Sequence, residues 1–108
     1  MATVNEVMDL AKSKIAENAA DVRSLGAVYK FVLNGDGGGT FLLNLKDDPG
    51  VSEGDGPADC TLTMAVGDFL EMVESRADAR QYFFLGKVGV QGDFGLAIKL
   101  RKLSDMFR

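Results

Sequence analysis

The chain predicts an α+β fold, in which helices pack on a mostly antiparallel sheet. Three observations indicate this fold: a helical apolar pattern at the start of the chain, apolar–polar alternation in several short runs, and a Gly-rich turn between two of those runs. The predicted order of elements is α-β-β-β-α-α-β-α. Consecutive strands joined by tight turns favour an antiparallel-rich sheet over a doubly wound parallel one.

An amphipathic helix is expected over residues 3–22. Thr3 followed by Glu6 is a capping box, in which each side chain satisfies an orphan backbone amide at a helix start. Apolar residues then recur at spacings of three and four, so they share one stripe of the helix. The stripe consists of Val4, Val7, Met8, Ala11, Ile15, Ala19 and Val22. Such a stripe predicts a helix that covers a sheet.

Two strands and a hairpin are expected next. Residues 26–33 and 40–46 are rich in strand formers, and the Asn-Gly and Asp-Gly pairs within 34–39 are typical of a hairpin turn. The same Gly-rich stretch superficially resembles a phosphate-binding loop. It lacks the terminal Gly-Lys-Ser/Thr and the following helix that such a loop needs, so the hairpin is favoured.

A loop and a third strand follow. Residues 47–57 are acidic and rich in Gly and Pro, which predicts a solvated loop, and their spacing does not match a calcium-binding loop. Residues 58–64 alternate strictly between polar and apolar side chains, which predicts a strand with one buried face. The inward side chains of that strand would be Cys60, Leu62 and Met64.

The last third of the chain predicts a short helix, a second short helical turn starting at Asp78, a strand and a final helix. Asp68 is expected to cap an amphipathic helix that carries Phe69 and Val73. A strand is expected over 87–91, and Asp93 is expected to cap the last helix. That helix has a narrow apolar stripe made of Leu96, Leu100, Leu103 and Phe107.

The last helix is apolar on a second side as well, because Phe94 and Ile98 project away from its stripe. One interpretation is a helix packed in a groove of the core. The other is a helix with one face on the protein and the other lining a cavity or touching a membrane. Basic residues concentrate here, where they form a solvated face or attract anionic headgroups. They are Lys99, Arg101, Lys102 and Arg108.

Composition excludes several functional classes. The 108 residues predict a single domain over 1–108, and a net charge of −4 argues against a nucleic-acid partner, which requires a concentrated basic face. The chain has no His and one Cys, so zinc and other metal sites are not expected, and neither is an organic cofactor. Cys60 on the apolar strand face is expected to be an inert core thiol. Nucleophilic catalysis lacks an activating base, which predicts that the chain is not an enzyme.

The chain resembles the sterol carrier protein 2 (non-specific lipid-transfer) domain family over essentially its whole length. The resemblance rests on the order and spacing of several short segments rather than on one motif. The matching segments are residues 29–33, 41–46, 58–64, 68–69, 84–88, 92–93 and 96–100. It implies a five-stranded, mostly antiparallel sheet covered on one face by helices, with a hydrophobic lipid tunnel between them. It also implies loosely selective binding of fatty acids, fatty acyl-CoA, phospholipids and sterols.

The resemblance implies where the lipid would lie. Phe69 and Val73 would be on a helix of the tunnel wall, and Phe83 and Phe84 would precede the strand that borders it. The stripe of the last helix would face the tunnel. The full set of expected lipid-binding residues is Phe69, Val73, Phe83, Phe84, Leu96, Leu100, Leu103 and Phe107.

The expected partners are a lipid ligand and, transiently, membrane surfaces, with the protein a monomer. No secretory signal or membrane-spanning run is evident, so an intracellular location is expected, cytoplasmic or peroxisomal. The chain does not end in the peroxisomal Ser-Lys-Leu type of tail. Two alternatives stay open at this point: a small hot-dog-like acyl-CoA thioesterase, and a dimerising or partner-binding module that uses the last helix as its interface.

Overall fold

A computed structural model describes residues 3–75 and 86–99 of the chain. Its elements are α1 (Val4–Glu17), α2 (Ala19–Arg23), β1 (Ala27–Asn34), β2 (Gly39–Leu45), β3 (Gly50–Glu53), β4 (Cys60–Ala65), α3 (Val66–Ser75) and β5 (Val88–Gly92). Residues 94–99 are helical and are called helical segment 94–99 below. The architecture is α+β, as predicted.

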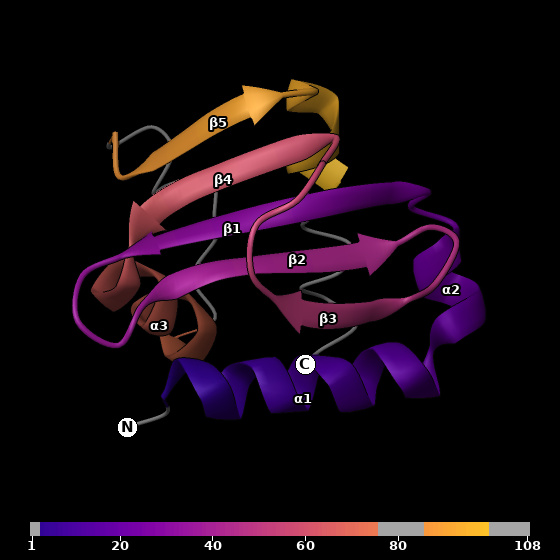
Figure 1. Cartoon of the computed structure of the whole chain (residues 1–108), viewed down its shortest axis with the longest axis horizontal. Coiled ribbons are helices and arrows are strands. Elements are labelled where there is room, and N and C mark those ends of the chain that lie inside the picture. Colours follow the sequence, from indigo (N-terminus) through magenta and orange to yellow (C-terminus); the bar gives the residue numbers. More distant parts are fainter. Residues whose placement is uncertain (1–2, 76–85, 100–108) are drawn as a thin grey trace.

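The strands form one five-stranded sheet in the order β3-β2-β1-β4-β5 (Figure 1). The predicted hairpin is confirmed, because β1 pairs with β2 in antiparallel register, with Phe31 opposite Phe41. The β2–β3 and β4–β5 pairs are antiparallel as well. Only β1 and β4 run parallel among the paired strands, with Phe31 opposite Leu62. The sheet is therefore mixed and mostly antiparallel.

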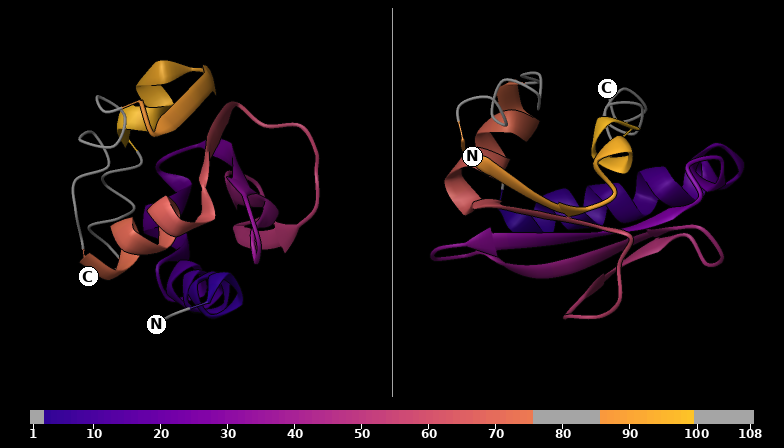
Figure 2. Two further views of the ribbon diagram at one scale, coloured as in Figure 1. Left: turned by 90° about the vertical axis from the view of Figure 1, so that its left-hand side faces the viewer. Right: turned by 90° about the horizontal axis from the view of Figure 1, so that it is seen from above.

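The helical layer lies on one face of the sheet. Figure 2 shows α1, α3 and helical segment 94–99 on the same side when the sheet is seen edge-on. The element α1 packs against the edge strand β3, whereas α3 contacts β1 and β4 near the centre. The connection between β3 and β4 crosses the opposite face, in front of β2 and β1 in Figure 1. Each face of the sheet thus has a different cover.

The core lies between the sheet and this helical layer. Alternate residues of the central strands are buried, which is the period of two expected for a sheet with one covered face. The largest fully buried side chains include Tyr29, Ile15 and Leu45. The predicted inward set of β4 is confirmed: Cys60, Leu62 and Met64 are all buried.

The expectation of an uninterrupted loop over residues 47–57 is wrong, because Gly50–Glu53 form β3. This strand is an edge strand whose pairing with β2 places Val51 opposite Leu43. Its Gly, Ser and Glu content gives it little intrinsic strand preference. The non-local hydrogen bonds with β2, rather than local sequence, make this segment extended.

The first helix is shorter than expected, because the helical pattern over residues 3–22 breaks at Asn18 into α1 and α2. The Asn18 side chain donates to the carbonyl of Lys14 at 2.9 Å, and its backbone N–H also bonds into the last turn of α1. These bonds satisfy carbonyls that have no helical partner. At the other end, the predicted cap is confirmed: the Thr3 hydroxyl accepts from the Glu6 N–H at 3.2 Å.

Two predicted caps of later helices have different outcomes. Asp68 is not the cap of its helix, because α3 begins two residues earlier, directly after β4. It instead lies in the first turn, where a carboxylate complements the positive end of the helix dipole. Asp93 is a cap, as predicted: its Oδ1 accepts from the Gly95 N–H at 2.9 Å, and its carbonyl accepts from the Leu96 N–H at 3.1 Å.

Candidate functional site

The covered face of the sheet is the apolar floor on which the candidate site is built. Phe31 of β1 and Leu62 of β4 lie side by side in register and are both buried. Phe69 of α3 packs on this floor, with its ring centroid 6.0 Å from that of Phe31 in an edge-to-face arrangement. This geometry is favourable for aromatic pairs and fixes α3 against the sheet. Among the described residues, no charged side chain is buried in the core.

The structure describes three of the eight expected lipid-binding residues. Phe69 is buried in the core, and Leu96 is partly buried against the same core cluster. Val73, one turn along α3 from Phe69, is 40% exposed. Phe69 and Leu96 therefore pack in one cluster, whereas Val73 is largely exposed to solvent. The other five lie outside the described residues: Phe83, Phe84, Leu100, Leu103 and Phe107.

Helical segment 94–99 has two sides, as the sequence predicts. Leu96 and Ala97 pack against the core, whereas Phe94 and Ile98 are 48% and 56% exposed. Three features join the start of this segment to the sheet. The Asp93 N–H donates to the carbonyl of Asp59 at 3.1 Å, and the Tyr29 hydroxyl donates to the carbonyl of Leu96 at 2.7 Å. The third is a close backbone approach at Gly92.

At Gly92 the chain leaves β5 with φ = 92°, a conformation that favours glycine. A Cβ at this position would lie 2.4 Å from the carbonyl oxygen of Asp59. The glycine thus permits the close contact between the end of β5 and the residue before β4. Together with the Asp93 bond, it fixes where the helical segment begins.

Tyr29 and Cys60 are the buried titratable groups at the centre of the sheet. Burial, with smaller contributions from Cys60 and the carboxylates of Asp93 and Asp59, raises the pKa of Tyr29 to about 12. Burial also raises the pKa of the Cys60 thiol, with the Asp93 carboxylate as a second cause. Both groups are therefore protonated at neutral pH. A protonated, buried thiol is a poor nucleophile, which gives the described part of the site no activated group of this kind.

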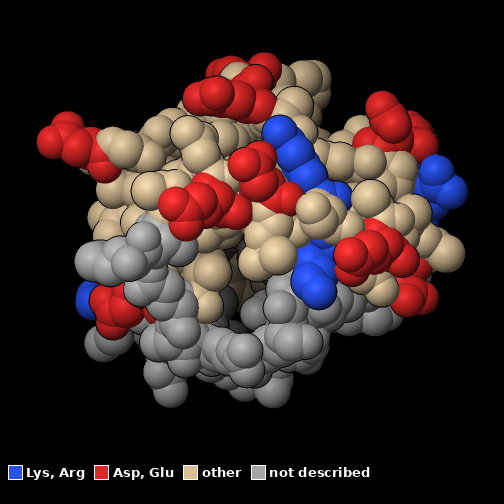
Figure 3. Space-filling model, turned by 90° about the horizontal axis from the view of Figure 1, so that it is seen from below, with Lys and Arg blue, Asp and Glu red and all other residues tan. Residues whose placement is uncertain are grey.

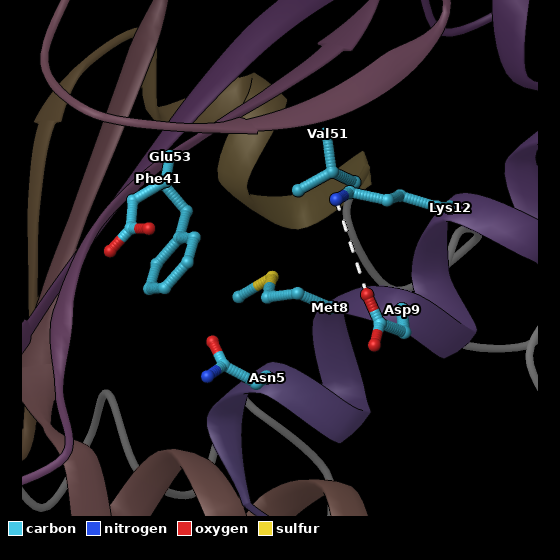
Figure 4. A pocket seen from close by; sticks show the side chains of 7 residues that line it. All are labelled: Asn5, Met8, Asp9, Lys12, Phe41, Val51 and Glu53. Carbon is cyan, nitrogen blue, oxygen red and sulfur yellow. Dashed lines mark ion pairs between the residues drawn. The ribbon is translucent and has the colours of Figure 1, made fainter.

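A hollow of about 240 Å³ opens between α1 and the β2–β3 edge (Figure 4). Its apolar lining is Met8, Phe41 and Val51, and its polar lining is Asn5, Asp9, Lys12 and Glu53. Lys12 and Asp9 form a long ion pair of 4.0 Å on its α1 side. The volume is below the roughly 300–1,000 Å³ of most small-molecule sites. This hollow is too small to be a complete lipid site by itself.

Among the described residues on the α1 side of the molecule, the charged side chains are of mixed sign. Figure 3, which views the molecule from below, shows acidic groups spread over the described part of this face with a few basic groups between them. In the described parts of the chain, no helix is both long and apolar enough to span a bilayer. The same parts contain no cluster of three or more His, Cys, Asp or Glu residues placed to hold a metal ion.

Two features of the site region were missed by sequence reasoning. The hollow beside α1 depends on β3, which the sequence did not predict. The Tyr29–Leu96 hydrogen bond joins residues 67 positions apart, so no local pattern could indicate it. The available signal was a Tyr at an inward strand position, since a buried phenol requires a hydrogen-bond partner. The sequence did not specify which partner that is.

Comparisons with known proteins agree on one family. The model of the SCP-2 sterol transfer family matches residues 4–105. Hydroxysteroid dehydrogenase-like protein 2 of Xenopus laevis is 38% identical over 89 residues, covering 80% of this chain and 21% of that protein. The chain thus spans about a fifth of that curated relative.

Solved structures agree with the family match. Sterol carrier protein 2 of Yarrowia lipolytica, in its apo form, superposes with a TM-score of 0.80 at 25% identity, covering 94% of this chain and 88% of that one. Sterol carrier protein 2 of Aedes aegypti, solved in complex with palmitate, has a TM-score of 0.78 at 21% identity, with both chains fully covered. At 21% identity, the similarity to the Aedes aegypti protein shows only that the two chains share a fold. The chain belongs to the SCP-2 sterol transfer family.

Proposed function

We propose that this chain binds single lipid molecules between its sheet and its helical layer, and transfers them between membranes inside the cell. The observation that carries the proposal is the family match across residues 4–105. The geometry supports it, since the helix-covered face is lined by apolar side chains and its described core contains no buried charge. We further propose that residues 1–108 act as one lipid-binding domain, without a metal or organic cofactor.

The proposed ligands are fatty acids, fatty acyl-CoA, phospholipids and sterols. An apolar site distinguishes poorly between aliphatic groups, so loose selectivity is expected. Phe69, Val73 and Leu96 are the described residues proposed to contact the lipid. Phe83, Phe84, Leu100, Leu103 and Phe107 complete the proposed set.

A binding titration tests the first half of the proposal. A fluorescent fatty acid is titrated into the folded protein and then displaced with unlabelled palmitate, the lipid named in the complex of the Aedes aegypti neighbour. The expected result is saturable binding of about one lipid per chain, with complete displacement. Signal that rises linearly without saturation, in protein shown to be folded by circular dichroism, would contradict it.

A vesicle assay tests the second half. Donor vesicles carry a fluorescent phospholipid and a non-exchangeable quencher, and acceptor vesicles carry neither. We expect the protein to speed the appearance of fluorescence in proportion to its concentration, through brief contacts with the membrane surface. Phe94 and Ile98, both well exposed, are candidates for that contact. Binding without any transfer would limit the proposal to lipid storage.

The matched part of the dehydrogenase-like relative is about a fifth of that protein, so its name carries no reaction over to this chain. We propose that the chain acts without catalysis and as a monomer. Release of free thiol from acyl-CoA in the presence of the protein would contradict the first point and favour the thioesterase alternative. A dimer mass in analytical ultracentrifugation would contradict the second and favour the interface alternative.

A further inference from the structure

Besides the packing of Leu96 and Ala97 on the core, the described attachment of helical segment 94–99 to the sheet has two parts of different character. The first part is made by the backbone at Gly92 and Asp93, where the chain passes close to the carbonyl of Asp59. The second part is one side-chain contact, in which the Tyr29 hydroxyl reaches the carbonyl of Leu96 at 2.7 Å. Among the described residues, this hydrogen bond acts beyond the start of the segment together with the packing of Leu96 and Ala97 on the core. Loss of the hydrogen bond would therefore weaken the attachment at Leu96 while the origin of the segment stays fixed.

The Tyr29 hydroxyl has no evident role in packing β1 itself. The residue is fully buried at the centre of the sheet, paired in register with Leu43 on one side and Cys60 on the other. A Phe side chain would fill almost the same volume in that position. The hydroxyl adds one thing, a donor that extends from the core to the helical segment. Because the phenol is buried, losing that partner would leave a polar group unsatisfied.

We propose that Tyr29 is a positioning residue for lipid exchange: its hydroxyl holds helical segment 94–99 against the sheet and thereby slows the release of bound lipid. This inference rests on the proposed function, because it takes the segment as a wall of the lipid site. Opening of that wall must break the Tyr29–Leu96 hydrogen bond. The frequency of opening then sets an upper limit on the rate at which lipid leaves.

The variant Tyr29→Phe removes the donor and keeps the shape. The matched control is Lys30→Met, which removes a hydrogen bond of the same length from the next residue of β1 on the other face of the sheet. There the Lys30 ammonium contacts the Asp55 carboxylate at 2.7 Å, away from helical segment 94–99. Loss of one hydrogen bond typically changes an opening equilibrium by about fivefold.

The first readout is amide hydrogen exchange of the lipid-free protein, followed by NMR. In Tyr29→Phe we expect exchange at residues 95–99 to rise about fivefold relative to the amides of β1, and in Lys30→Met we expect no such local rise. A rise spread evenly over the whole chain, or none at all, would overturn the positioning role. This readout needs no lipid.

The second readout is the dissociation rate of a fluorescent fatty acid, measured by stopped-flow mixing with excess acceptor vesicles. We expect Tyr29→Phe to release lipid about fivefold faster and Lys30→Met to match the unsubstituted protein. Equal dissociation rates in all three proteins would overturn the claim that Tyr29 controls the release of lipid. Failure of the unsubstituted protein to bind lipid would overturn the proposed function and, with it, the role of Tyr29 in lipid release. The amide hydrogen exchange experiment would still decide whether Tyr29 positions the helical segment.

Discussion

The two faces of the sheet differ in what covers them and in what holds the cover. On the helix-covered face, Phe31 and Leu62 are buried among apolar side chains, and Phe69 packs on them from α3. On the other face, the connection between β3 and β4 makes polar contacts with the sheet, including the Lys30–Asp55 ion pair at 2.7 Å. The buried apolar side chains of the central strands lie on the first face. Because of this difference, we expect an apolar ligand to bind between the sheet and the helices, and not between the sheet and the β3–β4 connection.

The largest expected effect is the loss of a side chain from the covered face. Leu62→Ala should lower the free energy of unfolding by about 3 kcal/mol, since it leaves a cavity in the packed core. Thr63→Ala, one residue on and facing the other side, should cost less than about 1 kcal/mol. Urea unfolding followed by circular dichroism measures both. Equal losses would show that the two faces are not energetically distinct.

A pH effect should follow from the buried phenol. The pKa of Tyr29 is about 12 in the folded protein and 10.0 in its unperturbed state, so the folded state favours the neutral phenol. The resulting stability is fully present below pH 10 and is lost as the pH rises toward 12. We expect the free energy of unfolding to fall by ~2 kcal/mol more in the unsubstituted protein than in Tyr29→Phe over this window. Parallel pH profiles for the two proteins would contradict this expectation.

Val73→Asp tests whether an exposed residue beside the core belongs to the lipid site. Val73 is 40% exposed, so a carboxylate there should change the free energy of unfolding by less than about 0.5 kcal/mol. Placed against bound lipid, the same carboxylate should weaken affinity by about tenfold or more. The matched control is Leu10→Asp, at an exposed position on α1. Equal affinities for the two variants would remove Val73 from the proposed site.

The smallest effect is expected for the exposed carboxylates in the connections before and after β3. The combined variant Asp47→Asn, Asp48→Asn and Asp55→Asn should change lipid affinity by less than about twofold, because the three carboxylates are exposed and lie in the connections before and after β3. The Lys30 ammonium lowers the pKa of Asp55, so that carboxylate stays ionised in the folded protein at neutral pH. A large loss of affinity in the folded variant, measured by titration, would assign these residues to the lipid entrance.

The fold was largely predictable from the sequence because most of its elements carry local signals. The capping pair Thr3 and Glu6, the alternation of β4 and the Asp93 cap all act within a few residues. The strand β3 was missed because its extended form depends on pairing with β2 rather than on its own residues. The break at Asn18 was missed because the apolar stripe continues through it.

The candidate site was less predictable than the fold. Apolar periodicity identified Phe69 and Leu96 as inward-facing, but the same pattern suits a core residue and a lipid contact equally. Both residues pack on the core cluster, so burial alone does not separate the two roles. Val73 lies on the same helix as Phe69 and is well exposed, a difference that helical spacing did not indicate. Contacts between distant segments, such as Tyr29 with Leu96, require the folded chain.

The most direct test of the account is to locate a bound lipid relative to the two faces. Isotope-filtered NOE spectra would be recorded on methyl-labelled protein with unlabelled palmitate. We expect contacts from palmitate to methyl groups on the helical side, with Val73 and Leu96 as the described candidates. Contacts confined to Val32 and Leu42, whose side chains face the other side of the sheet, would contradict the claim that lipid binds under the helical layer.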